Sequence, residues 1–172
     1  MFEIHGSSLI HFKIVKNSKF TLTAIAPSDV ADVIRIAENC GLSPWSSKDY
    51  AIETRRSDST LLKLTSETGE TAGFIVGRRV PSTSMESGFD AEIYNIGVEK
   101  RFQRQGCGTL LMREFLDRCV AQKVQAVWLD VRISNRSAIA FYKKFGFSEY
   151  AARPGFYCDP VEDGLIMSLN LV

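Results

Sequence analysis

The stretch from Ala91 to Val120 constrains this chain most, because it reads as a strand, a glycine-containing loop and a helix in direct succession. The apolar run ends at Val98, the basic loop closes on Gly106-Cys107-Gly108, and apolar residues then recur at four-residue spacing. Glycines let a ligand approach the backbone, and the free amides and dipole of a helix start favour negative charge. The segment therefore predicts a site for a phosphorylated ligand, although two glycines also suit a plain strand-to-helix turn.

Two arginines in this loop, Arg101 and Arg104, favour the phosphate interpretation, because a guanidinium can donate two hydrogen bonds to phosphate oxygens. A P-loop is excluded, since no lysine follows Gly108, and a Rossmann fingerprint is excluded, since position 111 is Leu111. The remaining pattern, Gln/Arg-x-x-Gly-x-Gly/Ala, resembles the pyrophosphate-binding loop of the GNAT acyltransferase superfamily. In that family the ligand is coenzyme A.

The resemblance continues beyond the loop and is closest to RimI-type protein N-terminal acetyltransferases, which modify an alanine at the start of a ribosomal protein. It covers most of the chain from about Phe20 onward. Residues 127–135 are similar to the fifth strand of that family and its exit, and 138–147 are similar to the helix that follows. Residues 154–157 and 162–169 resemble the closing hairpin. Residues 43–46 resemble a Pro-Trp element near the substrate.

The resemblance implies the GNAT fold, an α/β (α+β) architecture with a central mixed, mostly antiparallel sheet of about six to seven strands flanked by about four helices. Residues 20–172 are predicted to form one such domain, whereas 1–19 fit no element and are an N-terminal extension of unknown role. The spacing of apolar residues and the positions of turn residues agree with this fold. They predict a strand at 20–26, helices after Pro27 and Trp45, a hairpin between 61–64 and 72–76, and a polar, flexible loop at 81–88.

The composition limits the possible partners. Lysines and arginines (21) nearly balance aspartates and glutamates (20), so we expect no nucleic acid and no anionic membrane as a partner. Four cysteines without a C-x-x-C pair, and two histidines far from them, predict neither zinc nor disulfides. No apolar run approaches about 18 residues, and no signal-peptide pattern is present. We expect a cytoplasmic monomer or weak dimer that needs no metal.

Two carboxylates are candidates for the general base that would deprotonate the acceptor amine. The resemblance places Glu92 where histone-type GNAT enzymes carry their base, and Asp130 where RimI-type enzymes usually have a glutamate. Asp130 is one methylene shorter and would act through a water. Strand alternation predicts one face with Glu92, Tyr94, Ile96 and Val98, and a neighbouring face with Trp128, Asp130 and Arg132. The structural alternatives are a solvated Glu92, and an Asp130 paired with Arg132 or Arg136.

Tyr142 is the candidate general acid, because the resembling family has a tyrosine beside the CoA sulfur; its alternative is core packing with Ile139 and Phe145. Asn135 either caps the next helix or binds the pantetheine or phosphate arm. Substrate-binding candidates are Trp45, Tyr94 and Tyr157. The predicted acetyl-CoA residues are Ile96, Gly97 and Val98 through their backbone, then Gln103, Arg104, Gln105, Gly106, Cys107, Gly108, Thr109, Asn135 and Tyr142.

The predicted function is acetyl-CoA-dependent N-acetylation of the N-terminal α-amino group of a protein, such as a ribosomal one, by direct transfer. Two alternatives stay open. One keeps the fold and the cofactor but uses a small-molecule amine or a lysine side chain as acceptor. The other is a noncatalytic acyl-CoA-binding sensor on the same scaffold.

Overall fold

The computed structural model describes residues 19–43, 45–82 and 88–171. Two 3₁₀ turns, η1 (Pro27–Asp29) and η2 (Lys100–Phe102), precede the helices α1 and α3. The helices are α1 (Val30–Asn39), α2 (Ser47–Glu53), α3 (Cys107–Ala121) and α4 (Arg136–Lys143). The strands are β1 (Phe20–Ala24), β2 (Ser59–Ser66), β3 (Thr71–Pro81), β4 (Phe89–Val98), β5 (Val124–Arg132), β6 (Ser148–Cys158) and β7 (Val161–Asn170).

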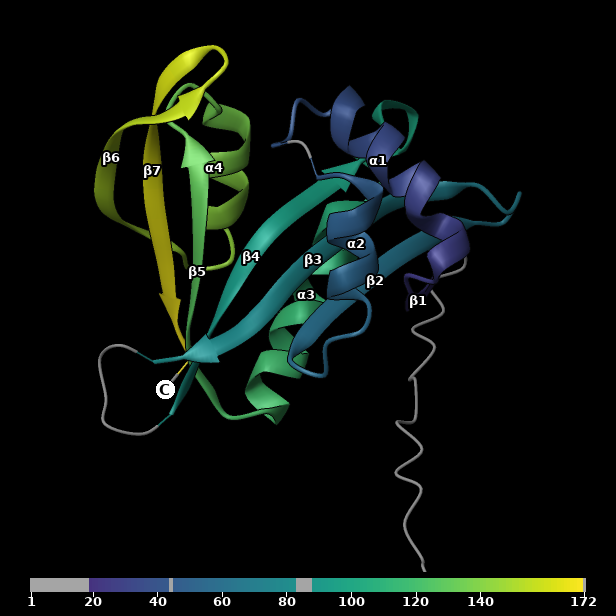
Figure 1. The fold of residues 1–172 in the computed structure, drawn as a ribbon, viewed down its shortest axis with the longest axis horizontal. Helices are drawn as coiled ribbons and strands as arrows, with labels where there is room; N and C mark the ends of the chain where they lie inside the picture. The colour runs from purple at the N-terminus through teal and green to yellow at the C-terminus, as the bar shows by residue number, and fades with distance from the viewer. Residues whose placement is uncertain (1–18, 44, 83–87, 172) are drawn as a thin grey trace, which may run out of the picture.

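The seven strands form one sheet in the order β1-β2-β3-β4-β5-β7-β6 (Figure 1). Among the strands of the described residues, only β4 and β5 pair in parallel, and every other neighbouring pair is antiparallel. The predicted mixed, mostly antiparallel sheet with four helices is confirmed. The predicted hairpin is the β2–β3 pair, and the predicted early helices are α1 and α2. The N-terminal extension, apart from Lys19, and most of the loop at 81–88 lie outside the described residues.

Helices cover both faces of the sheet. On one face α1 and α2 bury Val33, Ile36 and Tyr50 against Phe74 and Val76 of β3. On the other face α3 and α4 enclose a larger core with the opposite side chains of β3, β4 and β5. The contributors from the two helices are Leu111, Met112, Phe115, Ile139 and Tyr142.

The strands β4 and β5 separate partway along their length. Their pairing ends at Ile93 opposite Leu129, whereas β4 continues beside β3 as far as Val98. Figure 1 shows the two strands diverging beyond this point. The edge of β4 that faces β5 is therefore unpaired from Tyr94 to Val98, and its backbone can serve a ligand inserted between the strands.

A β-bulge at Tyr94 reverses the alternation of β4. Val76 pairs with Asn95 and Gly77 with Ile93, so Tyr94 is an extra residue. Tyr94 packs with the α1–α2 core, whereas Ile96 and Val98 pack with the α3–α4 core. The prediction that Glu92, Tyr94, Ile96 and Val98 share a face is therefore wrong for the last two, because the inserted residue shifts the period by one.

Candidate active site

A cleft of about 1000 Å³ lies where β4 leaves β5, and is bounded by the end of β4, the loop before α3 and the helix α4. Almost all of the predicted acetyl-CoA residues line it, although they come from three separate segments of the sequence. They are Ile96, Gly97, Val98, Gln103, Arg104, Gly106, Cys107, Gly108, Thr109, Asn135 and Tyr142. Gln105 is the exception, because its side-chain Nε2 donates to the carbonyl of Arg101 at 2.8 Å.

The loop before α3 has a backbone shape that depends on glycine. Gly106 is the N-cap of α3 and adopts a φ of 86°, in the left-handed region. Gln103 Nε2 donates to the carbonyl of Val98 at 3.0 Å and so ties the loop to the end of β4. Gly108 lies in the first turn of α3, where an added Cβ would stand 3.4 Å from the Phe141 ring. The first turn of α3 thus borders the cleft with little side-chain bulk.

The charges around the cleft suit an anion. Three cationic side chains line it, those of Arg104, Arg113 and Lys144, and no aspartate or glutamate is among its described lining residues. A pyrophosphate would meet these cations at the positive end of the α3 dipole. The residues present therefore fit the diphosphate arm of coenzyme A.

Tyr142 reaches the cleft from α4 and is otherwise enclosed by core side chains. Burial raises its pKa far above the ordinary phenol value, and the nearby Tyr157 raises it further. The phenol therefore stays protonated at neutral pH, as a proton donor must before it acts. Asn135 both lines the cleft and caps α4, because its Oδ1 accepts from the amide of Ala138 at 3.1 Å. The two interpretations of Asn135 are compatible.

Glu92 and two aromatic side chains gather on the other face of the sheet, beside α2. Burial raises the pKa of Tyr94 to about 12, and the nearby Glu92 carboxylate, which favours the protonated hydroxyl, adds to this rise. The rings of Trp45 and Tyr94 have centroids 5.6 Å apart, and Trp45 also packs on Tyr50 at 5.3 Å. Two predicted substrate residues therefore adjoin one predicted base.

Asp130 lies across the sheet in β5 and pairs with a residue that the sequence did not suggest. Both of its carboxylate oxygens face one terminal nitrogen of Arg153, at 3.1 and 3.2 Å. Arg132 binds Glu162 at 3.3 Å instead. The structural alternative, in which Asp130 pairs with Arg132 or Arg136, is wrong in its partner, because the bulged strand β6 brings Arg153 over β5.

Tyr157 lies near both Asp130 and Tyr142. The guanidinium carbon of Arg132 lies 4.2 Å from the centroid of its ring. Burial raises the pKa of Tyr157, and the charge of Asp130 adds to this rise.

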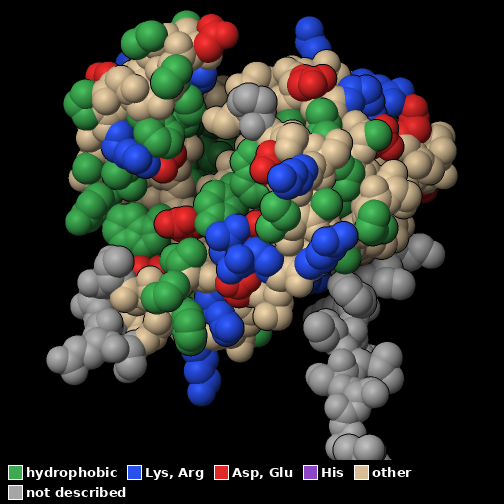
Figure 2. All heavy atoms as spheres, in the orientation of Figure 1, with side chains coloured by type: hydrophobic (Ala, Val, Ile, Leu, Met, Phe, Trp, Pro, Cys, Tyr) green, Lys and Arg blue, Asp and Glu red, His purple; other side chains and the backbone are tan. Residues whose placement is uncertain are grey.

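The two carboxylates thus stand on opposite sides of the same opening. Glu92 is the register partner of Trp128, and Asp130 follows two residues later on the same face of β5. Figure 2 shows the molecule hollowed on this side, between the arm formed by β5, β6 and β7 and the region of α1 and α2. An acceptor entering here would approach from the face opposite to the α3–α4 core.

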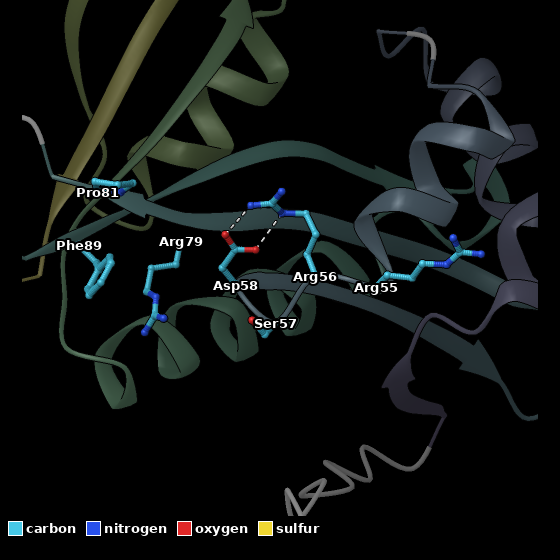
Figure 3. A pocket seen from close by; sticks show the side chains of 7 residues that line it. All are labelled: Arg55, Arg56, Ser57, Asp58, Arg79, Pro81 and Phe89. Carbon is cyan, nitrogen blue, oxygen red and sulfur yellow. Dashed lines mark hydrogen bonds and ion pairs between the residues drawn. The ribbon is translucent and has the colours of Figure 1, made fainter.

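A second hollow, of about 510 Å³, lies at the far end of β3 (Figure 3). Arg56 spans it in a two-pronged ion pair with Asp58, and Arg79 lies with its guanidinium carbon 4.3 Å from the Phe89 ring centroid. In Figure 3 the Arg55 side chain points away from the others. None of the predicted site residues lines this hollow.

Several cleft residues were missed by the sequence reasoning. The end of α1 and the residues after it contribute Asn39, Cys40 and Leu42, and α4 and the turn after it contribute Phe141 and Phe145. No local motif marks these positions, since they join the cleft only through packing. Cys107 was expected to offer its amide alone, and burial raises the pKa of its thiol, which keeps the thiol neutral and poorly nucleophilic.

Among the described residues, no cluster of three or more histidine, cysteine or acidic side chains could hold a metal ion. No helix in the described ranges is long and apolar enough to cross a membrane.

Comparison with known proteins identifies the class. The profile of the acetyltransferase (GNAT) family matches residues 30–147, and the chain belongs to this family. It is an N-acetyltransferase that uses acetyl-CoA.

Within that family the chain resembles the RimI type. It is 30% identical over 153 residues to the [ribosomal protein bS18]-alanine N-acetyltransferase of Escherichia coli K12. The matched region covers 88% of this chain and 97% of the relative. The crystal structure of the Escherichia coli ribosomal-protein-S18-alanine N-acetyltransferase superposes with a TM-score of 0.75 at 30% identity, over 88% of this chain and 94% of that one. The Ard1 structure from Thermoplasma volcanium gives a TM-score of 0.78 at 31% identity, over 89% of this chain and 98% of that one.

Proposed function

We propose that this protein transfers an acetyl group to the N-terminal α-amino group of a protein, of the ribosomal-protein-alanine type. The observation that carries the proposal is the arrangement of the two faces around the β4–β5 opening. The acetyl-CoA cleft lies on one side, whereas Trp45, Tyr94 and Tyr157 with both carboxylates border the other. The full-length similarity to the Escherichia coli enzyme, named for a ribosomal-protein alanine, supports this choice of acceptor.

The chemistry of the amine supports the same acceptor class. A free α-amino group has a pKa of about 7.7–8.0, whereas a lysine side chain has one near 10.4. Deprotonating lysine at neutral pH therefore costs about 3–4 kcal/mol more. A site that relies on one or two carboxylates can more readily produce the neutral form of a chain terminus.

Glu92 is the better placed of the two candidate bases. Asp130 directs both oxygens at one nitrogen of the Arg153 guanidinium, so an incoming amine would compete with a charge-assisted contact. Glu92 interacts with the neutral Tyr94 hydroxyl and keeps capacity for an amine or a bridging water. We assign Glu92 as the base, and Asp130 as the residue that orients the β6 side of the site through Arg153.

When bound, acetyl-CoA supplies an activated thioester. Tyr142 then holds a proton at its hydroxyl within the cleft, where a departing thiolate can accept a hydrogen bond from it. The unpaired edge of β4 from Ile96 to Val98 offers backbone groups that orient the cofactor.

The test is free thiol release by the purified protein with acetyl-CoA and short peptides that begin with Ala or Ser. We expect turnover on these peptides, and only background when the same peptide is N-terminally blocked and carries an internal lysine. Turnover on small amines with none on peptides would replace the proposed acceptor by a small molecule. Tight acetyl-CoA binding without turnover on any amine would instead indicate a sensor.

A further inference from the structure

A buried ion pair beneath α2 lies next to the candidate base. Glu53, at the end of α2, is only 2% exposed. It accepts hydrogen bonds from Arg78 Nε at 2.9 Å, from a second Arg78 nitrogen, and from the Ser59 hydroxyl. Burial works to raise the pKa of Glu53, but these hydrogen bonds outweigh it and the pKa is lowered. The carboxylate therefore stays ionised and holds the Arg78 guanidinium by two prongs.

Arg78 in turn contacts the bulged residue of β4. Its guanidinium carbon lies 5.3 Å from the centroid of the Tyr94 ring, within the range of a cation–π contact. Arg78 is also the cross-strand partner of Glu92 in the β3–β4 register. The bulge frees Tyr94 from regular pairing, so its direction depends on its side-chain contacts. Arg78 and Trp45 are two of those contacts.

These contacts form a continuous path from α2 to the acceptor side of the site. Glu53 holds Arg78, Arg78 contacts the Tyr94 ring, and Tyr94 interacts with Glu92, which is also the cross-strand partner of Arg78. We propose that Arg78, fixed by Glu53, is a positioning residue that orients Tyr94 and, through its hydroxyl, the Glu92 carboxylate toward the acceptor amine. The inference rests on the proposed function, because it takes Glu92 as the base.

We expect the fold to stay stable when both charges of this ion pair are removed together. A buried pair can often be replaced by uncharged residues with little loss, whereas removing one partner alone leaves a buried charge and is strongly destabilising. This difference separates a positioning role from a purely structural one. Neutralising both partners should restore stability, but it cannot restore the orientation that the guanidinium gives to Tyr94.

Three variants test the proposal, each measured for kcat, for KM of the acceptor, for acetyl-CoA Kd and for unfolding midpoint. Arg78→Met should unfold at lower temperature. The double variant E53Q/R78M should recover most of that midpoint, yet its kcat should stay about 10- to 100-fold below wild type, because misplacement of a reacting group by about 1 Å costs this much. Tyr94→Phe, which keeps the ring but loses the hydroxyl, should show the same fall in kcat. Acetyl-CoA Kd should change less than twofold in all three.

The matched control is Arg118→Met on α3. Arg118 has the same 27% side-chain exposure as Arg78 and also forms an ion pair, with Glu114, but on the other face of the sheet. We expect its kcat to equal that of the wild type. A wild-type kcat in E53Q/R78M or in Tyr94→Phe would overturn the proposal, and so would a parallel loss of acetyl-CoA binding.

The assay uses whichever amine the wild-type protein acetylates. A wild type that rejects peptides but acetylates a small amine would contradict the proposed acceptor. The role of Arg78 would still be decided on that amine by the same comparison of kcat in the double variant and the wild type.

Discussion

At the scale of single residues, Tyr142, the proposed proton donor, has a pKa that keeps it protonated. It lines the cleft, and its burial raises the pKa of the phenol far above 10. The chemistry of the acceptor therefore sets the pH dependence. We expect kcat/KM to rise through about pH 8 as the α-amine loses its proton, and to stay level up to about pH 10. Because burial raises the pKa of Tyr142, the hydroxyl loses its proton only above this pH range, and the rate does not fall within it.

Replacing Tyr142 by Phe removes the donor and preserves the ring that packs with Phe147 at 5.8 Å. We expect kcat to fall by about 100-fold or more, the usual contribution of general acid–base catalysis, with acetyl-CoA Kd nearly unchanged. Steady-state rates over pH 6–10, with isothermal titration of the cofactor, measure both. A variant with the rate and pH profile of the wild type would remove Tyr142 from the mechanism.

The ion-pair partners of charged residues could not be predicted from the sequence. Asp130 was recognised as a candidate, but its partner Arg153 is 23 residues away and reaches it only across β7. The predicted alternatives, Arg132 and Arg136, were arginines close to it in the sequence. The same holds for Glu53 and Arg78, which are 25 residues apart and meet only because α2 packs on β3. Such pairs depend on tertiary packing, and no local pattern records them.

At the scale of elements, the start of α3 was the most predictable part of the molecule, because its signal is local. A strand, two glycines and an amphipathic helix occur within thirty residues, and the structure folds them into one side of the cleft. The bulge in β4 was not predictable in the same way. Alternation of side chains assumes regular pairing, and the extra residue at Tyr94 is defined only by the register with β3.

Replacing Gly106, the N-cap of α3, and Gly108, in its first turn, by alanine should have different effects on stability and cofactor binding. Gly106 has a φ of 86° and open space around a Cβ, so Gly106→Ala should cost about 1–2 kcal/mol of stability through backbone strain alone. Gly108 is helical, and its Cβ would make an ordinary contact with Phe141 at 3.4 Å. Gly108→Ala should therefore keep wild-type stability or gain up to about 1 kcal/mol, while the added methyl weakens acetyl-CoA binding.

Denaturant unfolding and cofactor titration of the two variants distinguish these effects. The expected result is a loss of stability in the first variant and a loss of cofactor affinity in the second. Equal acetyl-CoA affinity in Gly108→Ala and wild type would mean that the first turn of α3 does not approach the ligand closely.

At the scale of the whole molecule, the sheet consists of two parts joined by a short parallel seam. The strands β1 to β4 form one part and β5, β7 and β6 the other, and β4 pairs with β5 only as far as Ile93. The cleft has walls from both parts, since β4 and the loop before α3 belong to one side and α4 to the other. A ligand in the cleft therefore adds contacts across the seam where the strands provide none.

Acetyl-CoA should consequently stabilise the entire fold. A ligand that binds only the folded state at 100 times its Kd adds about 2.7 kcal/mol. At about 2–4 °C per kcal/mol for a chain of this size, the midpoint should rise by roughly 5–11 °C. Hydrogen exchange should slow at Ile96 and Val98, because their amides face the open strand edge that gains a partner, whereas the Gly97 amide faces β3. Scanning calorimetry and exchange measured with acetyl-CoA, and with adenosine at equal concentration as control, provide the comparison. Protection confined to the first turn of α3, with no change at the β4 edge, would show that the ligand binds the loop without joining the two parts.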